Sequence, residues 1–182
     1  MDTSVGILLV IVLIAVGVVA WVFIQRRRTE ELRQRFGPEY DHTVSELGDQ
    51  REAEAELEAR KKRVERLDIQ PLAAAERDRF VTAWHSTQAQ FVDEPAAAIA
   101  EADRLVAEVM RARGYPVGDF EQRAADISVD HPNVLANYRA AHTIALANER
   151  GEANTEDLRQ AMVHYRALFE ELLETREREV AQ

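Results

Sequence analysis

The stretch LRQAMVHYRALFEELL, residues 158–173, decides the fold of this chain. Its large apolar side chains recur at spacings of three and four residues, at Leu158, Met162, Tyr165, Phe169 and Leu172. These spacings place the side chains on one face of an α-helix and leave charged residues on the other face. The pattern therefore predicts a helix that begins at a cap at Asn154 or Thr155, ends at about Arg178 and buries one face.

Three earlier segments repeat this spacing, which predicts helices over 73–92, from about 93 onward, and over 132–149. The aligned side chains are, in order, Phe80, Trp84, Thr87 and Phe91; Ile99, Ala102, Val106 and Val109; and Leu135, Tyr138, His142 and Ala145. A shorter helix is expected over 118–127, and no stretch alternates convincingly with period two. The sequence therefore predicts an all-α fold in which residues 71–182 form a small, acidic helical bundle.

The stretch VMRARGYPVGDF, residues 109–120, gathers glycine, proline and arginine in a mixture typical of a functional loop. Its order is also that of a helix end, because Gly114 stands where a left-handed residue closes a helix and Pro116 follows two residues later. The stretch therefore predicts a turn between two helices, and no substrate is needed to explain it. Two interpretations of Tyr115 stay open: it packs back on the helix that it leaves, or it contacts a partner.

Residues 5–24, VGILLVIVLIAVGVVAWVFI, form an uncharged stretch. A helix of that length measures about 30 Å, the thickness of the hydrocarbon core of a bilayer. Asp2 precedes the stretch and three arginines at 26–28 follow it, the reverse of the charge order of a cleaved signal peptide. We therefore expect residues 1–24 to be a single-pass transmembrane helix that anchors the chain in the lipid bilayer of a bacterial inner membrane, with the N-terminus outside and the C-terminal domain in the cytoplasm.

Residues 25–70 are predicted to form juxtamembrane and stalk helices. Pro38 interrupts the first of them, because proline disfavours a helical conformation at the residue before it. Thr43 and Glu46 have the spacing of a capping box, which predicts that one helix restarts there and runs to about Asp68. The apolar residues of that helix are sparse, which predicts a largely solvated stalk and leaves open a weak coiled coil or self-association through it.

The charge and composition of the chain exclude several function classes. The sequence has 33 acidic residues and 23 Lys or Arg residues, a net charge of −10; residues 1–28 carry +2, so residues 29–182 carry −12. A surface that follows nucleic-acid phosphates needs excess positive charge, so direct nucleic-acid binding is not expected. The chain has no cysteine, which excludes disulfides, thiolate catalysis and cysteine-ligated metal sites.

No motif in the sequence identifies an enzyme. The His-Glu-x-x-His pattern of zinc proteases and the glycine patterns of phosphate-binding loops do not occur. Ser45, Ser86 and Ser128 lack the context of a nucleophile elbow. The sequence therefore predicts no catalytic residue, no metal site and no cofactor.

Two predicted helices carry related hexapeptides, NYRAAH at 137–142 and HYRALF at 164–169, and each places a tyrosine and an arginine beside a histidine. One interpretation is a pocket for an anion or an acidic peptide between antiparallel helices. The other is a pair of interfacial tyrosines with arginines at the rim and hydrogen-bonded core histidines. The candidate contacts for a partner or ligand are Trp84, Tyr115, Tyr138, Arg139, His142, His164, Tyr165 and Arg166.

Four segments together resemble an uncharacterised family of bacterial, largely actinobacterial, single-pass membrane-anchored helical proteins. They are RFGPEYD, FVDEPAAAIAEADRLVAEVMRARGYP, SVDHPNVLANYRAAH and LRQAMVHYRALFEELL. The resemblance implies a single-pass bacterial membrane protein. It implies no activity, cofactor or catalytic residue.

The anchor, the stalk, the acidic bundle and the absence of catalytic motifs favour a membrane-tethered adaptor or scaffold. Such a protein would bind a protein partner, or a second copy of itself, at the cytoplasmic face. The alternative is a small-molecule sensor or an enzyme with its site in the bundle core, near Trp84, Tyr138 and His142. A third arrangement, with the bundle outside the cytoplasm, conflicts with the arginines at 26–28.

Overall fold

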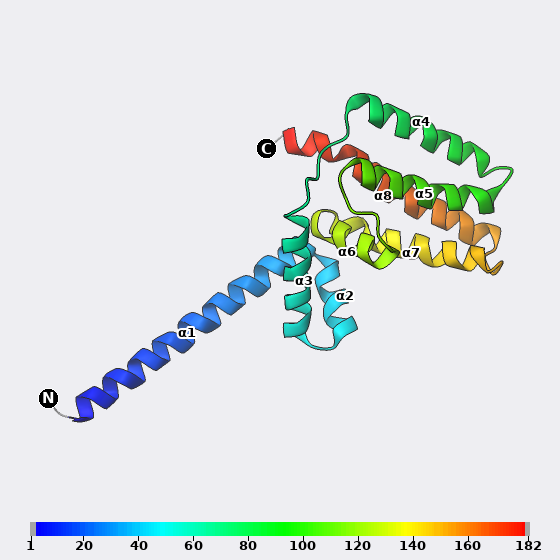
Figure 1. Cartoon of the computed structure of the whole chain (residues 1–182). Helices are drawn as coiled ribbons and strands as arrows, with labels where there is room; N and C mark the ends of the chain where they lie inside the picture. Colours follow the sequence, from blue (N-terminus) through cyan, green and yellow to red (C-terminus); the bar gives the residue numbers. More distant parts are fainter. Residues whose placement is uncertain (1–2, 181–182) are drawn as a thin grey trace. The chain divides into compact units, whose positions relative to one another are not determined.

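The computed structural model describes the backbone of residues 3–180 and the side chains of residues 12–173, and over these residues the chain is helical without a strand (Figure 1). The all-α prediction is confirmed. The helices are α1 (Thr3–Phe36), α2 (Pro38–Leu47), α3 (Gln50–Val64), α4 (Ala74–Gln90), α5 (Pro95–Ala112), α6 (Phe120–Asp130), α7 (Pro132–Glu149) and α8 (Thr155–Val180). The chain divides into two compact units, Met1–Glu58 and Ala59–Gln182, here called the N-terminal unit and the C-terminal unit.

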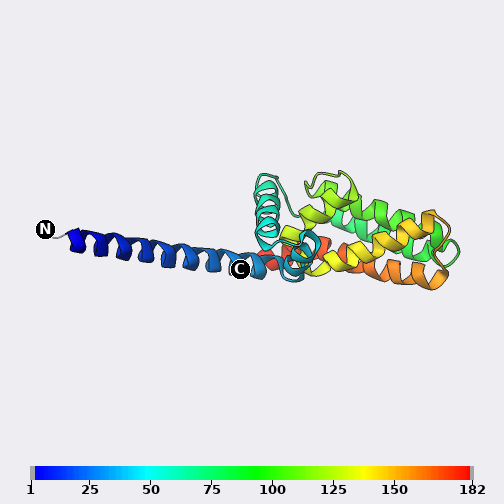
Figure 2. The ribbon, with the colours of Figure 1, turned by 90° about the horizontal axis from the view of Figure 1, so that it is seen from below.

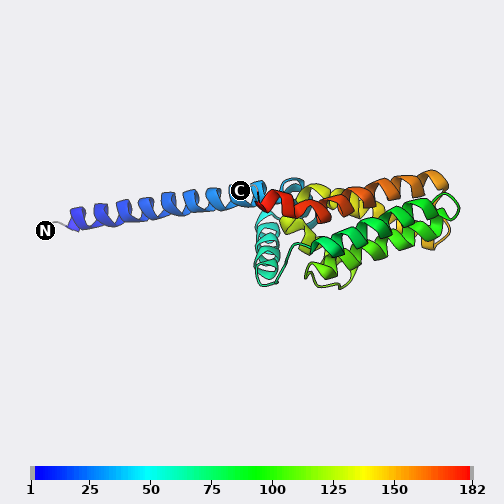
Figure 3. The ribbon, with the colours of Figure 1, turned by 90° about the horizontal axis from the view of Figure 1, so that it is seen from above.

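The C-terminal unit is a bundle in which α5, α7 and α8 pack against one another and α4 packs on α5 (Figures 2 and 3). Most of the side chains in the stripes that the sequence predicts on these helices are buried, from Phe80 on α4 to Leu172 on α8, and Phe91, His142 and Ala145 are half-buried. Trp84 stacks on Phe169 with 4.7 Å between the ring centroids, which joins α4 to α8 in the core. Full burial of each such side chain stabilises the unit by about 1.5–3 kcal/mol, so this core accounts for the bundle that the sequence predicts.

The corner after α5 is the turn that the sequence predicts. Gly114 has a φ of 98°, and its N–H donates to the carbonyl oxygen of Arg111 over 3.0 Å. The N–H of Tyr115 donates to the carbonyl oxygen of Met110, also over 3.0 Å, which completes a Schellman motif. A Cβ atom on Gly114 would lie only 2.3 Å from the carbonyl oxygen of Asp68. Glycine is therefore required here both by the positive φ and by the close approach of the backbone at Asp68.

Helix α6 is displaced from the range predicted for it. It begins at Phe120 because Asp119 caps it, accepting a hydrogen bond from the N–H of Gln122 over 2.8 Å. It continues to Asp130 and ends only where His131 precedes Pro132, a position at which helical backbone is disfavoured. The prediction of a helix over 118–127 is thus right about the element and three residues short at its end.

The N-terminal unit breaks its helices at two glycines. Gly37 has a φ of 49° and ends α1, and α2 begins at Pro38, where a missing N–H and a fixed φ are suited to a first turn. The predicted restart at Thr43 is wrong, because the Thr43 hydroxyl lies inside α2 and donates to the carbonyl oxygen of Glu39 over 2.9 Å. Gly48, with a φ of 72°, then ends α2, so the single helix predicted from Thr43 onward is two helices.

Side chains from all three helices of the N-terminal unit are buried, including Ala53 and Leu57 within the helix expected to be a largely solvated stalk. Those that are buried and apolar are Leu32, Phe36, Tyr40, Ala53 and Leu57. Glu54 on α3 connects the helices, since its Oε1 accepts hydrogen bonds of 2.8 Å from the hydroxyls of Thr29 on α1 and Tyr40 on α2, and one from the side-chain amide of Gln50. Burial raises the pKa of Glu54, but these hydrogen bonds outweigh burial and hold that pKa below its ordinary value.

The described part of α1 before Gln25 exposes its apolar side chains on every side. Leu13, Ile14 and Val19 are 67%, 62% and 69% exposed, and at about 100° per residue they lie on three different sides of the helix axis. The predicted span at 5–24 starts outside the residues whose side chains are described. Over the described part of the chain, no helix combines the length and apolar character needed to cross a membrane.

Candidate functional site

Four side chains from four helices meet inside the C-terminal unit, and we call them the polar box: Asp103 on α5, Arg123 on α6, Tyr138 on α7 and Tyr165 on α8. The hydroxyl of Tyr165 donates to Oδ1 of Asp103 over 3.0 Å. Nε of Arg123 donates to the hydroxyl oxygen of Tyr138 over 2.9 Å, and Nη2 of Arg123 lies 3.8 Å from Oδ2 of Asp103. One chain of polar contacts thus connects the four helices.

The two tyrosines of the polar box are fully buried, whereas Arg123 and Asp103 reach solvent with part of their side chains. Burial raises the pKa of Tyr138 and of Tyr165, and the negative charge of Asp103 adds to the effect at Tyr165. Both phenols therefore stay protonated at neutral pH, with their oxygens engaged in hydrogen bonds. This arrangement satisfies buried polar groups and fixes helix positions, and it provides no phenolate for general-base catalysis.

His142 lies beside the polar box, stacked on Phe120 with 3.7 Å between ring centroids and 7° between planes. Phe120 also contacts the ring of Tyr138, 4.8 Å away. Burial lowers the pKa of His142, so its ring is neutral near pH 7. Its Nδ1 is buried and has no hydrogen-bond partner within the described residues. A neutral imidazole with an unused nitrogen is the feature of this site that suits a small ligand.

The structure brings together three of the eight predicted contact residues: Tyr138, His142 and Tyr165. The partners that organise them, Asp103 and Arg123, are absent from the predicted set. Asp103 lies in the middle of α5, in a run of alternating charged and apolar residues where a carboxylate has no distinguishing motif. Arg123 stands in a short helix with no distinguishing motif. A local pattern does not reveal either residue, because their partners are on other helices.

The remaining predicted residues of the two hexapeptides lie apart from the polar box. Nδ1 of His164 is 2.9 Å from Oδ1 of Asn137, which joins α8 to α7. Arg166 is exposed, and its Nε lies 3.9 Å from Oε1 of Glu170 one turn away. Arg139 is half-buried on α7. The histidine and the two tyrosines thus follow the interfacial interpretation, while Arg166 pairs along its own helix.

A second group of polar side chains is buried where α5 and α6 end and α7 begins, against the interior of α8, and we call it the Arg113 cluster. Nη1 of Arg113 donates to the carbonyl oxygen of Leu172 over 3.0 Å and lies 3.3 Å from Nε2 of His131. Nδ1 of His131 lies 3.2 Å from Oε1 of Glu171. Because a guanidinium only donates, Nε2 of His131 accepts from Arg113, and its Nδ1–H donates to Glu171. His131 is therefore a neutral connection between a buried cation and a carboxylate.

Tyr115 belongs to the same corner, which decides between its two interpretations. It is buried, its ring lies 5.7 Å from the guanidinium carbon of Arg113, and its hydroxyl donates to Oδ2 of Asp130 over 3.2 Å. Burial, followed by the charge of Asp130, raises the pKa of Tyr115 well above its ordinary value. Tyr115 is thus part of the turn, packed within its own unit.

Asp126 is a fully buried carboxylate with partners from two segments. Nε of Arg63 donates to its Oδ1 over 2.8 Å, and the side-chain amide of Gln122 lies 3.0 Å from both carboxylate oxygens. Within the described part of the chain, no group of three or more His, Cys, Asp and Glu side chains is arranged to hold a metal ion. Asp126 is therefore the acidic partner of an internal ion pair with Arg63.

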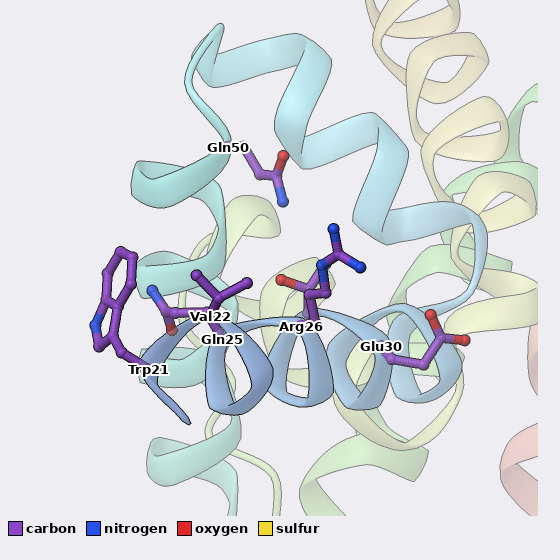
Figure 4. A pocket seen from close by; sticks show the side chains of 7 residues that line it. Trp21, Val22, Gln25, Arg26, Glu30 and Gln50 are labelled. Atoms are coloured by element: carbon purple, nitrogen blue, oxygen red, sulfur yellow. The ribbon is translucent and has the colours of Figure 1, made fainter. Parts of the chain in front are cut away.

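The N-terminal unit contains a pocket of about 410 Å³ between α1 and the first residue of α3, and we call it the α1–α3 notch. It is lined by Trp21, Val22, Gln25, Arg26, Thr29, Glu30 and Gln50. Figure 4 shows that Arg26 and Gln50 extend toward one another across the notch, with Trp21 at one end and Glu30 at the other. A smaller pocket of about 170 Å³ adjoins it through Gln25 and is lined also by Arg28, Arg51, Glu54 and Ala55.

Comparison with known proteins adds no relative, because no family model, curated protein or solved structure matches the chain. The resemblance to a family of membrane-anchored helical proteins stays a prediction. The functional inference rests on the geometry of the two units.

Proposed function

We propose that this protein is a membrane-tethered adaptor: the N-terminal apolar helix lies in the bilayer, and the helical bundle binds a protein partner or a second copy at the cytoplasmic face. The observation that carries the proposal is the exposure of apolar side chains around the whole circumference of α1 over residues 12–24. Soluble monomers rarely expose contiguous apolar surface of this extent. A bilayer covers all sides of a helix at once, whereas a single partner covers one face.

The arginines at 26–28 support the orientation. They follow the apolar residues directly and are exposed. Basic residues are retained on the cytoplasmic side of a membrane segment, so the chain beyond residue 28 is assigned to the cytoplasm. Residues 29–182 carry −12, which favours a partner with a basic surface, because complementary charge increases association rates and suppresses unsuitable partners.

The chemistry of the bundle supports an adaptor over an enzyme. The hydroxyls of Tyr138 and Tyr165, the imidazole of His131 and the carboxylate of Asp126 all have hydrogen-bond partners within the C-terminal unit. Groups that are hydrogen-bonded in this way stabilise the fold of the bundle, and they are already engaged within the protein rather than directed at a substrate. Binding through its surface is the function that such a bundle serves best.

In-cell crosslinking of the tagged full chain, followed by detergent purification and mass spectrometry, tests the adaptor function. A chain of residues 1–40 serves as the control that keeps the anchor and lacks the bundle. We expect one partner, or the protein itself, to be enriched by the full chain and lost with the control. Equal recovery of every crosslinked protein with both chains would refute the adaptor function.

One observation favours a second candidate function, a small-molecule sensor. The unpartnered Nδ1 of His142, beside the Phe120 stack, is a buried acceptor or donor that a ligand would satisfy. Thermal-shift screening of the detergent-solubilised full chain against metabolites and metal ions tests it. A stabilising compound whose effect disappears in His142→Phe, but persists in His85→Phe at an exposed position, would support this function.

A further inference from the structure

We propose that the α1–α3 notch binds the headgroup of an anionic phospholipid, an inference that rests on the proposed membrane anchor. The notch combines an indole, a guanidinium and two side-chain amides on the wall of one pocket. Its location along α1 and its chemistry both agree with such a ligand.

The position of the notch relative to the bilayer follows from where the exposed apolar surface of α1 ends. Ile24 is the last of the exposed apolar residues of α1, and the notch residues on α1 run from Trp21 to Glu30. At about 1.5 Å per residue, Arg26 and Thr29 lie roughly 3–8 Å beyond Ile24 along the helix axis. The polar headgroup layer is about 5–8 Å thick on each side of a bilayer. The polar wall of the notch therefore lies at the level of the phosphates.

The side chains of the notch suit a phosphate that carries acyl chains. Arg26 forms no ion pair with any residue of the described part of the chain, and a planar guanidinium binds phosphate through two parallel N–H groups. The amides of Gln25 and Gln50 add donors, and Trp21 is of the type enriched where acyl chains meet headgroups. The notch thus offers polar contacts above an apolar entrance.

Charge in the notch and its neighbouring pocket favours an anion. The two pockets together are lined by three arginines, at 26, 28 and 51, and two glutamates, at 30 and 54. Glu54 already accepts three hydrogen bonds, and Glu30 lies at the end of the notch away from Trp21 (Figure 4). The three arginines and two glutamates give the combined lining a net charge of +1.

A matched control is available on the same turn of α1. The guanidinium carbon of Arg27 lies 4.5 Å from the centroid of the Phe23 ring, and Arg27 does not line either pocket. Arg26→Gln and Arg27→Gln therefore remove the same charge at nearly the same depth. They differ in whether the lost side chain lines the notch, so they separate a defined site from diffuse attraction between arginines and anionic lipid.

Quenching of Trp21 by brominated lipids tests the proposal. The chain has two tryptophans, so Trp84→Phe leaves Trp21 as the sole reporter in full-length protein reconstituted into vesicles. Phosphatidylglycerol brominated near the headgroup, diluted in phosphatidylcholine, is compared with brominated phosphatidylcholine at the same mole fraction in the same lipid mixture. We expect at least twofold stronger quenching by the anionic lipid, loss of that excess in R26Q and its retention in R27Q.

Equal quenching by the two lipids, or equal loss of the excess in R26Q and R27Q, would overturn the lipid site and leave the anchor intact. Release of the full chain from membranes by alkaline carbonate would overturn the proposed function and this inference together. Suppression of the excess by millimolar inorganic phosphate would assign the notch to a free anion instead. Native mass spectrometry of retained phosphatidylglycerol in the R26Q and R27Q chains with Trp84 intact gives the same comparison without W84F.

Discussion

Two regions of this molecule depart in opposite directions from the usual placement of side chains. Along α1, residues 12–24 expose large apolar side chains, among them Leu13 and Val19. In the C-terminal unit, Arg113, Asp126 and His131 are buried. Each buried polar group has partners in its own unit, whereas the apolar surface of α1 is not covered within the described chain. We therefore expect the apolar surface of α1 to contact something other than the described chain, and we propose that it contacts the bilayer.

The largest effect is expected from charge on the exposed apolar helix. Ile14→Asp combined with Val18→Asp would oppose membrane insertion by about 5–7 kcal/mol, since each acidic residue near the centre of a membrane helix costs about 2.5–3.5 kcal/mol. We expect the full chain to move from the carbonate-resistant membrane fraction to the soluble fraction. Val92→Asp, at an exposed turn of the C-terminal unit, is the control and is expected to stay with the membrane.

On the buried side of the comparison, Arg113→Ala should lower the free energy of unfolding by about 3–4 kcal/mol. The substitution leaves His131 and the Leu172 carbonyl without their donor and removes a packed side chain. Denaturant unfolding in detergent of the full chain carrying Trp21→Phe, followed by the fluorescence of the remaining Trp84, measures the change. Arg111→Ala, two residues away and exposed, should change it by less than about 0.5 kcal/mol. Similar losses in both variants would mean that the Arg113 cluster is not a special source of stability.

Two glycines of the C-terminal unit form a matched pair, Gly114 at the corner after α5 and Gly151 between α7 and α8. Gly114→Ala should destabilise the C-terminal unit by about 2–5 kcal/mol, since it adds a strained positive φ and a steric overlap with Asp68. Gly151→Ala has the same kind of φ and open space around it, so about 1 kcal/mol is expected. Thermal unfolding of the two variants checks the difference, and equal losses would show that the close approach of Asp68 carries no cost.

A smaller loss is expected within the polar box. Tyr165→Phe removes the hydrogen bond to Asp103 and should cost about 1–2 kcal/mol, because the carboxylate reaches solvent and is partly compensated by water. Tyr138→Phe removes the acceptor of Arg123 and should cost a similar amount. In the double variant the two losses should fall short of their sum, as expected for one network. Strict additivity in denaturant unfolding would show that the box is two independent contacts.

The smallest effect is a dependence on pH that arises from His131. Burial, assisted by Arg113 and opposed by the hydrogen bond to Glu171, lowers the pKa of His131 below its ordinary value of 6.5. The unfolded chain then binds the proton more readily, so the stability contributed is complete above about pH 6.5 and is lost as the pH falls toward the folded-state pKa. His131→Asn should flatten that part of the stability profile. An unchanged slope would assign it to other groups, such as His142, whose pKa is also lowered.

Elements with a local signal were predictable, and contacts between helices were not. The stripe from Leu158 to Leu172 fixes its helix through spacing alone, and the order of residues after Met110 fixes the turn at Gly114. The capping spacing at Thr43 misleads, because Pro38 starts a helix one turn earlier.

The candidate site was predictable only in part for the same reason. The two hexapeptides indicate Tyr138 and Tyr165, yet the residues that pair with them come from α5 and α6. Asp103 and Arg123 look locally like ordinary charged residues of amphipathic helices. Their role becomes visible only when the four helices are packed together. The spacing of residues along a single helix does not contain this information.

The most direct test of the central claim uses the absence of cysteine from the chain. Single cysteines are introduced by Ser4→Cys, before the apolar stretch, and by Val92→Cys, at a turn that is 81% exposed, and intact cells are treated with a membrane-impermeant thiol reagent. We predict labelling of S4C in intact cells and labelling of V92C only after the membrane is permeabilised. Labelling of V92C in intact cells, or of neither site before permeabilisation, would contradict the membrane-tethered arrangement with a cytoplasmic bundle.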